Sequence, residues 1–337
     1  MKSNFPTKIF LSEVMIVKHK ILSALKNTDG YLSGEQLSNT LGVTRSAVWK
    51  YVNALKDDGY VVDSVRNKGY RLVSSPDKLD YEDICEGLKS RVIGRKVILL
   101  DVVDSTNDEI KRLAAQGEEN GTVVAAERQT AGKGRFGRVW DSQNGGLFFT
   151  VLLRTELPPS DIASITLAAG YAVCLAVREY TGLDARIKWP NDVIVGSRKV
   201  CGILTEMAAQ SDRIDYVAIG IGINVNHEAF PEELRKKATS LRLETGKKLD
   251  RNRFFSVVLS YLDEVLSRFL VSLSVDDLNN FKTLCASLGK RVEVERGGMR
   301  LCGIATDVTT GGELVVTGDD GTETIVGSGE VTVQGIY

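Results

Sequence analysis

The segment Gln129-Thr130-Ala131-Gly132-Lys133-Gly134-Arg135-Phe136-Gly137-Arg138-Val139-Trp140 concentrates glycine and positive charge in one short stretch. Its three glycines are interleaved with the cations Lys133, Arg135 and Arg138. Glycine lets a backbone turn tightly and approach a ligand closely, while lysine and arginine bind anionic oxygens. The segment therefore predicts a loop that binds an anion.

The glycine spacing of this loop also fits other nucleotide-binding patterns, which the surrounding sequence argues against. A dinucleotide-binding loop opens directly into a helix, whereas Asn144-Gly145-Gly146 and an apolar strand follow here. A protein kinase needs later His-Arg-Asp and Asp-Phe-Gly motifs, and neither occurs. A Walker loop needs Ser or Thr after Gly-Lys, but Gly134 follows Lys133. A basic surface hairpin is the remaining alternative.

Polar motifs recur at the ends of apolar segments around this loop. We expect strands at 97–103, 122–127, 147–153, 185–188, 193–195, 199–206 and 216–220, and helices at 163–180 and 254–269. A shorter helix opens at Asp104-Ser105-Thr106-Asn107 and runs toward Ala115. Further motifs are Lys188-Trp189-Pro190-Asn191-Asp192, the segment 199–206 and the glycine-containing segment 220–226. Each motif alone is equally compatible with a strand end or a turn. Together the elements predict an α/β or α+β sheet domain at residues 80–285.

Residues 16–75 have the pattern of a winged helix-turn-helix. A first helix is expected to end near Asn27, and Ser33 with Gln36 predicts a capping box for a second helix that ends at Gly42. Thr44 caps a third helix, and two strands around the basic turn 66–68 predict a wing. Residues 1–72 hold 11 Lys or Arg against 6 Asp or Glu, an excess that favours a nucleic-acid contact.

The third helix carries the predicted DNA-contacting face. Val48, Val52 and Leu55 form its buried stripe, and polar or basic side chains of the opposite face are suited to phosphates and base edges. A helical bundle with a solvated charged face is the alternative, and Trp49 is as compatible with packing as with DNA contact. The predicted DNA-binding residues are Arg45, Ser46, Trp49, Lys50, Asn53, Arg66 and Lys68.

The composition is that of an ordinary soluble globular protein, with 337 residues and a net charge of −1. Five scattered cysteines are typical of reduced thiols in the cytoplasm, and two histidines leave little for a zinc site. No apolar run is expected to reach membrane-spanning length, and we expect no signal peptide. Residues 1–14 show no clear pattern and are expected to be either a flexible extension or sequence upstream of a true start at Met15.

Residues 288–337 predict a third, small β domain. Short strands are expected at 291–294, 299–305, 313–316 and 322–325, separated by glycine-containing turns such as Thr310-Gly311-Gly312. This pattern predicts a small β-barrel.

In this order the motifs resemble those of the bacterial bifunctional biotin–protein ligases that also repress the biotin operon. The resemblance covers about residues 16–335 and rests on the loop 132–140, on Lys-Trp-Pro-Asn-Asp and on Arg-Lys-Val-Cys-Gly-Ile-Leu-Thr-Glu. It implies a multidomain α+β fold, with a class II synthetase-like mixed-sheet ligase domain at 80–285 and an SH3-like barrel at 288–337. Family loops often carry Arg at the position of Lys133 and a second basic residue at that of Phe136.

The family reaction implied by this resemblance has two steps. The biotin carboxylate attacks the α-phosphate of Mg-ATP to give biotinyl-AMP, and a lysine of the biotin carboxyl carrier protein of acetyl-CoA carboxylase then takes the biotin. A carboxylate is already ionised at pH 7, so the expected catalysts are cations that bring two anions together, namely Lys199, Arg135 and Lys133. The residues implied for biotin are Ser105, Thr106, Asn107, Gln129, Lys133, Gly134, Arg135, Lys199 and Gly202. Those implied for ATP are Arg138, Trp140, Lys188, Asn191, Asp192 and Asn224, with Trp140 stacking on adenine, Mg²⁺ accompanying ATP, and no protein ligand of the metal identified.

The resemblance also implies that biotin supply controls transcription. The adenylate-bound protein is expected to form a homodimer on a two-fold operator, with the glycine-rich loop ordering around biotinyl-AMP. The protein is expected in the cytoplasm, with no membrane partner. A lipoate–protein ligase is the first alternative, and the basic loop and the DNA-binding unit argue against it. A ligand-sensing repressor without ligase activity is the second, and Lys199 with the loop cations argues against it.

Overall fold

The computed structural model describes residues 13–210, 213–271, 275–296 and 299–337. The chain divides into two compact units, residues 1–77 and 78–337. The expected extension at residues 1–14 lies outside the described residues, apart from the two with which the first helix begins.

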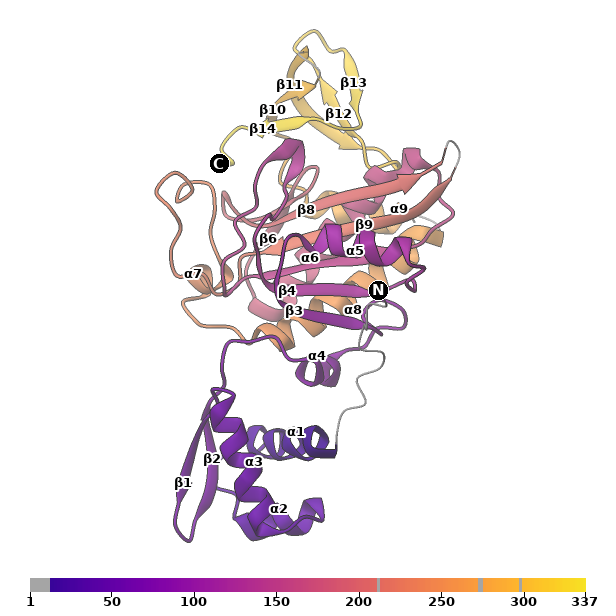
Figure 1. Ribbon diagram of the computed structural model, residues 1–337. Coiled ribbons are helices and arrows are strands. Elements are labelled where there is room, and N and C mark those ends of the chain that lie inside the picture. The colour runs from indigo at the N-terminus through magenta and orange to yellow at the C-terminus, as the bar shows by residue number, and fades with distance from the viewer. Residues whose placement is uncertain (1–12, 211–212, 272–274, 297–298) are drawn as a thin grey trace. The chain divides into compact units, whose positions relative to one another are not determined.

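Over residues 13–77, the first unit contains three helices followed by a two-stranded antiparallel sheet (Figure 1). The predicted capping box is confirmed, because the Ser33 hydroxyl accepts the Gln36 N–H at 3.1 Å and the Gln36 side chain accepts the Ser33 N–H at 2.8 Å. Gly42 ends the second helix with a φ of 66°, a left-handed conformation that glycine adopts without strain. The elements are α1 (Glu13–Lys26), α2 (Gly34–Leu41), α3 (Arg45–Asp57), β1 (Val61–Val65) and β2 (Gly69–Ser74).

One apolar core joins the three helices of this unit to its sheet. Leu32 and Tyr70 exchange two backbone hydrogen bonds of 2.8 Å, which tie the wing to the start of α2. The core side chains are Ile21, Leu22, Leu25, Leu37, Val48, Val52, Leu55 and Val62. Because α3 buries its predicted apolar stripe in this core, the opposite face of the helix is exposed to solvent. The three helices followed by a two-stranded sheet make this unit a winged helix-turn-helix.

A seven-stranded mixed sheet is the frame of the second unit (Figure 1). β3 runs parallel to β4, and every other neighbouring pair is antiparallel. In sheet order the strands are β3 (Val97–Val103), β4 (Val123–Gln129), β5 (Leu147–Leu153), β9 (Ile214–Ile223), β8 (Arg198–Ala209), β7 (Asp192–Val195) and β6 (Ala185–Lys188). Every residue of β5 is buried, as expected for a central strand.

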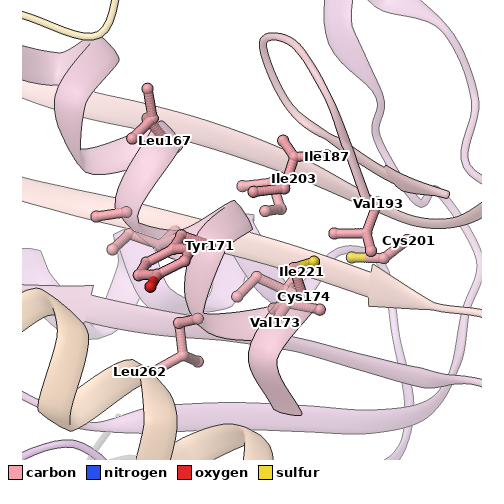
Figure 2. Close-up of a cluster of buried hydrophobic side chains, with 14 of the residues drawn as sticks. Leu167, Tyr171, Val173, Cys174, Ile187, Val193, Cys201, Ile203, Ile221 and Leu262 are labelled. Atoms are coloured by element: carbon pink, nitrogen blue, oxygen red, sulfur yellow. The ribbon is translucent and has the colours of Figure 1, made fainter. Parts of the chain in front are cut away.

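Helices cover both faces of this sheet. α5 (Thr106–Ala115) packs on one face, while α6 (Ile162–Thr181) and α8 (Arg251–Val271) build the main core on the other. Figure 2 shows Leu167, Tyr171 and Cys174 of α6 in one cluster with Ile203 and Ile221 of the sheet. The remaining helices are α4 (Tyr81–Gly87), α7 (Leu241–Thr245) and α9 (Val275–Leu284), with 3₁₀ turns η1 (Arg135–Gly137) and η2 (Pro159–Asp161).

The stretch Pro159–Thr181 corrects one expectation from the sequence. It is long and apolar enough to cross a membrane by length and composition, so the prediction that no apolar run reaches that length is wrong. Most of α6 is nevertheless buried against the sheet and α8. A helix surrounded by a protein core is apolar on all sides for that reason alone.

The segment after residue 288 forms a five-stranded antiparallel sheet, in the order β13-β12-β11-β10-β14. Its outer strands β13 and β14 do not pair with each other among the described residues, so the sheet is open and the predicted closure into an SH3-like barrel is not confirmed. Its buried side chains join the main core of the second unit. The strands are β10 (Arg291–Arg296), β11 (Met299–Val308), β12 (Leu314–Thr317), β13 (Glu323–Val326) and β14 (Glu330–Val333).

Candidate active site and DNA-binding face

Two adjoining cavities of the second unit gather the residues that the sequence singled out. All nine residues predicted for biotin line the first cavity. All six predicted for ATP line the second, whose volume is about 890 Å³. Both cavities are lined by Gly134, Arg135, Trp140, Asn191 and Lys199, so these five residues stand at their common boundary.

The glycine-rich segment forms a narrow hairpin beside these cavities. Lys133 and Val139 pair as an antiparallel bridge, and the Gly134 N–H donates to the Arg138 carbonyl at 2.7 Å. At the tip, Phe136 has a φ of 57° and its side chain is 64% exposed. The structure thus describes the loop in a single hairpin conformation, and its ordering around a ligand stays a prediction.

Three glycines of β8 and β9, which have no side chain, let other residues approach the sheet backbone closely at the first cavity. A Cβ on Gly202 would lie 2.7 Å from the Trp140 ring, one on Gly222 would lie 2.5 Å from Trp140 Nε1, and one on Gly220 would lie 2.1 Å from Asn107 Oδ1. Trp140 and Asn107 therefore pack directly on the strand backbone. The Trp140 indole N–H is buried without a hydrogen-bond partner among the described residues, which leaves a donor that a ligand or water can satisfy.

A connected set of uncharged polar groups lines the first cavity. Gln129 Oε1 accepts the Thr106 N–H at 2.8 Å and the Thr106 hydroxyl at 3.0 Å, and the Gln129 amide donates to Ser142 Oγ at 2.8 Å. The Thr150 hydroxyl lies 2.7 Å from Asn107 Oδ1. Because these side chains hold one another, the cavity offers fixed donors and acceptors to an uncharged polar ligand group.

Positive charge dominates the second cavity, which is lined by five cationic and three acidic residues. Lys199 Nζ pairs with Asp192 Oδ1 at 2.6 Å and lies 5.0 Å from the centroid of the Trp140 ring. The Arg135 guanidinium donates to Asn191 Oδ1 at 3.1 Å, and burial lowers its pKa. Burial also lowers the pKa of Lys188 to about 8. Such an excess of partly desolvated cations suits an anionic ligand.

Lys133 differs from the other predicted catalytic cations. It lines the first cavity, but its ammonium pairs with Asp108 at 2.7 Å and the side chain is 44% exposed. The hydrogen bond that Lys133 donates to Asp108 raises the pKa of Lys133, which stays protonated. Asp108 offsets part of the Lys133 charge, and the catalytic role of Lys133 stays a prediction.

Several residues of the site were not predicted. Ser142 and Thr150 do not line the first cavity but hydrogen-bond to polar side chains that do, and part of the segment 227–238 lines the second cavity. Tyr337 donates its hydroxyl to Asp192 Oδ2, and Glu330 forms an ion pair with Arg138. Gly220 and Gly222 also line the first cavity, and the sequence signal for them was glycine itself, which lets another group approach the backbone closely.

The predicted DNA-binding residues lie on the solvent side of α3 and in the wing turn. Trp49 is 61% exposed, which excludes the alternative that it packs in the core. Arg45 pairs with Glu35 at 2.6 Å, but both side chains are mostly exposed, so this pair contributes little and phosphates can replace it. The side chains of Ser46, Lys50, Arg66 and Lys68 are exposed, and that of Asn53 is half-buried.

Each unit matches a known family. Residues 17–71 match the model of an HTH domain, and residues 99–224 match the biotin/lipoate A/B protein ligase family. The fold and the site thus define a protein ligase of the biotin/lipoate class that is joined to a helix-turn-helix unit.

Relatives narrow this class. The bifunctional ligase/repressor BirA of Bacillus spizizenii is 45% identical over 224 residues, which cover 66% of this chain and 69% of that one. BirA of Escherichia coli is 31% identical over 302 residues, covering 89% and 92%. The structure of a biotin protein ligase from Aquifex aeolicus in complex with biotin and ATP is similar with a TM-score of 0.63 and 32% identity, covering 71% of this chain and 99% of that one. The chain belongs to the family of bifunctional biotin ligases and repressors.

Proposed function

We propose that the two cavities together make biotinyl-5′-AMP from biotin and ATP. The observation that carries this proposal is the position of Lys199, which lines both cavities. A biotin carboxylate held in the first cavity and the α-phosphate of ATP held in the second would meet at this ammonium. Arg135, which also lines both cavities, would add a second positive charge at the same boundary.

In the first step, a carboxylate oxygen of biotin forms a bond to the α-phosphorus. The bond from this phosphorus to its bridging oxygen breaks, and pyrophosphate leaves with the electron pair. The carboxylate is ionised at neutral pH, so no base has to remove a proton. The main barrier is the approach of two anions, which preorganised cations lower. Mg²⁺ would arrive bound to the phosphates of ATP.

In the second step, the neutral ε-amine of a carrier lysine attacks the carbonyl carbon of the mixed anhydride. An amide bond forms, the bond from the carbonyl carbon to the phosphate oxygen breaks, and AMP leaves while the amine releases a proton. We infer that the acceptor is the biotin carboxyl carrier protein of acetyl-CoA carboxylase.

The polar set of the first cavity supports its assignment to the ureido ring and nearby atoms of biotin. Gln129 and Thr106 are fixed by hydrogen bonds to each other, and Asn107 accepts one from Thr150. Ser105 stands at the start of α5 without making a side-chain capping bond. The further residues assigned to biotin are Lys133, Gly134 and Gly202. For ATP we assign Trp140 to the adenine and Arg138, Lys188, Asn191, Asp192 and Asn224 to the remainder.

The direct test incubates the protein with Mg-ATP and a biotin carboxyl carrier domain, offering biotin in one reaction and lipoate in another. Mass spectrometry of the carrier should show a single biotin adduct and no lipoyl adduct. A lipoyl adduct alone would identify a lipoate–protein ligase instead. A correctly folded protein that binds biotin but modifies nothing would be a ligand-sensing repressor.

We further propose that the adenylate-bound protein dimerises and represses the biotin operon. Ordering of the loop 132–140 by biotinyl-AMP would lower the entropy cost of forming a subunit interface, and a dimer presents two α3 helices to two half-sites. Operator titrations should tighten when biotin and ATP are added, in parallel with dimer formation in sedimentation runs. Equal operator affinity with and without biotin and ATP would contradict the proposed response to biotin. The five free cysteines of the chain agree with a cytoplasmic location.

A further inference from the structure

Tyr337 makes two separate contacts with cationic and acidic groups of the second cavity. Its hydroxyl donates to Asp192 Oδ2, and its ring centroid lies 3.7 Å from Lys188 Nζ. The residue is held by its backbone, because its N–H donates to the Ser197 carbonyl at 3.2 Å and Ile336 bridges to Val333. The ring is therefore a fixed wall of the cavity.

Asp192 connects this tyrosine to the lysine at the boundary of the cavities. One carboxylate oxygen accepts the Tyr337 hydroxyl, and the other lies 2.6 Å from Lys199 Nζ in an ion pair that lacks the geometry of a hydrogen bond. A carboxylate with both oxygens engaged by different partners cannot rotate to give both to one ammonium. The phenol thus limits how strongly Asp192 holds Lys199.

We propose that Tyr337 is a positioning residue for adenylate formation, which orients Asp192 so that Lys199 stays free to contact the reacting anions and which holds the Lys188 ammonium against its ring. The inference rests on the proposed ligase function. Tyr337 would have two separate effects. Its hydroxyl would act on Lys199 through Asp192, and its ring would act on Lys188.

Without the hydroxyl, both oxygens of Asp192 become available to Lys199. The ammonium would then be bound more tightly before reaction and would stabilise the transition-state charge less, which lowers kcat. Without the ring, the Lys188 ammonium loses a cation–π partner and its fixed position beside the phosphates, which weakens ATP binding. Tyr337→Phe removes only the first effect, and Tyr337→Ala removes both.

The experiment measures biotin-dependent pyrophosphate release by the full-length protein over a range of ATP concentrations. Tyr337→Phe should lower kcat about tenfold with KM for ATP within about twofold of wild type, which is near the lower end expected for loss of one hydrogen bond to a charged group. Tyr337→Ala should show the same loss of kcat and also raise KM for ATP about tenfold. Biotin affinity measured by calorimetry without ATP should stay unchanged in both, because Tyr337 does not line the first cavity.

A matched control is Tyr261→Phe. The Tyr261 hydroxyl also donates to a carboxylate, that of Glu179, but neither residue lines the two cavities. This variant should behave as wild type, which separates positioning from a general effect of losing a phenol–carboxylate bond.

Three outcomes would overturn the inference: wild-type kinetics in both Tyr337 variants, a higher kcat or lower KM for ATP in Tyr337→Ala, or an equal loss in the Tyr261→Phe control. A wild-type protein that releases no pyrophosphate with biotin would instead overturn the proposed ligase function. The wild-type reaction is therefore measured first, so that the two failures are distinguishable.

Discussion

The two units carry their functional residues in opposite ways. In the winged helix-turn-helix, the predicted contacts stand on the surface of one helix and one turn, within a segment of about 25 residues. In the second unit, the cavities are built from segments between Ser105 and Tyr337 that only the folded sheet brings together. Each surface contact adds a small, separate contribution, whereas a packed cavity depends on the exact fit of single atoms. The two units should therefore respond differently to substitution.

Removing residues 1–77 is the most severe test of this separation. Specific operator binding should be lost, a drop of about 10³-fold or more, while biotinylation of the carrier continues. The physical reason is that every residue of both cavities follows residue 104, and Leu79 is anchored to the second unit by its N–H bond to Glu127. Fluorescence anisotropy with operator DNA and mass spectrometry of the carrier measure the two activities. Specific binding by the truncated protein would contradict the division.

Lys199→Ala tests the boundary of the two cavities. We expect kcat for pyrophosphate release to fall about 10²- to 10³-fold, since preorganised charge is a large catalytic contribution. Operator binding by the variant without ligands should not change. Lys96→Ala, which breaks a surface ion pair with Glu118, is the matched control and should retain full activity. Near-normal pyrophosphate release by Lys199→Ala would show that Lys199 is not the main catalytic cation.

Gly222→Ala tests the dependence of the cavities on single atoms. The added Cβ would lie 2.5 Å from Trp140 Nε1 and must displace the ring, at a cost of about 1–3 kcal/mol. Pyrophosphate release at subsaturating ATP should fall about ten- to hundredfold. Gly170→Ala in α6 is the control, because its Cβ would meet Ile203 at an ordinary 3.6 Å. Similar activity in the two variants would show that Trp140 has room to move.

The pH dependence of ATP use tests whether Lys188 acts as a charge. Burial lowers the pKa of Lys188 to about 8, so the ammonium loses its proton as pH rises through that value, and with it the attraction for phosphates. The ratio kcat/KM for ATP, which follows the free enzyme, should fall about tenfold for each pH unit above 8. Lys188→Arg keeps its charge and should flatten this decline. A profile of the wild type that is flat to about pH 9.5 would exclude the role.

Trp49→Ala should give the smallest effect. Loss of one exposed contact in a groove should weaken operator binding about five- to tenfold, near 1 kcal/mol, without changing biotinylation. Val52→Ala in the same helix serves as the contrast, because this buried side chain acts through stability and should lower the melting temperature instead. If Trp49→Ala leaves operator binding unchanged, the predicted DNA contact of this side chain is wrong.

Local patterns were enough to predict most of the elements. The bounds of β3 and β5 agree with the prediction because each is a short, mostly apolar run with clear ends. The bounds of β6 also agree, where apolar and charged residues alternate. β8 and β9 extend beyond the predicted ranges, since hydrogen bonds to their neighbours keep glycines and polar residues in strand conformation. α4, α7, α9 and β14 were not predicted, and each is short and depends on tertiary packing.

Within the site, too, residues in local motifs were predicted and residues that depend on tertiary contacts were not. The glycine-rich loop and Lys199 stand in motifs whose residue types indicate the chemistry directly. Thr150 lies in an apolar strand and Tyr337 in a segment assigned to a separate domain, so nothing local connected either of them to the cavities. Their roles depend on contacts over more than 40 residues of chain, which a single sequence does not reveal.

The pairing of β5 with β9 has a consequence for the order in which the protein gains its activities. These neighbours in the sheet are separated in the chain by α6, β6, β7 and β8, and β9 carries Gly220 and Gly222. Contacts between distant segments form later than local ones, and N-terminal units fold first during synthesis. A growing chain would thus present its DNA-binding helix before it has a place for biotin or ATP. Newly made molecules would pass through an interval in which the DNA-binding helix is folded but the protein does not yet respond to biotin.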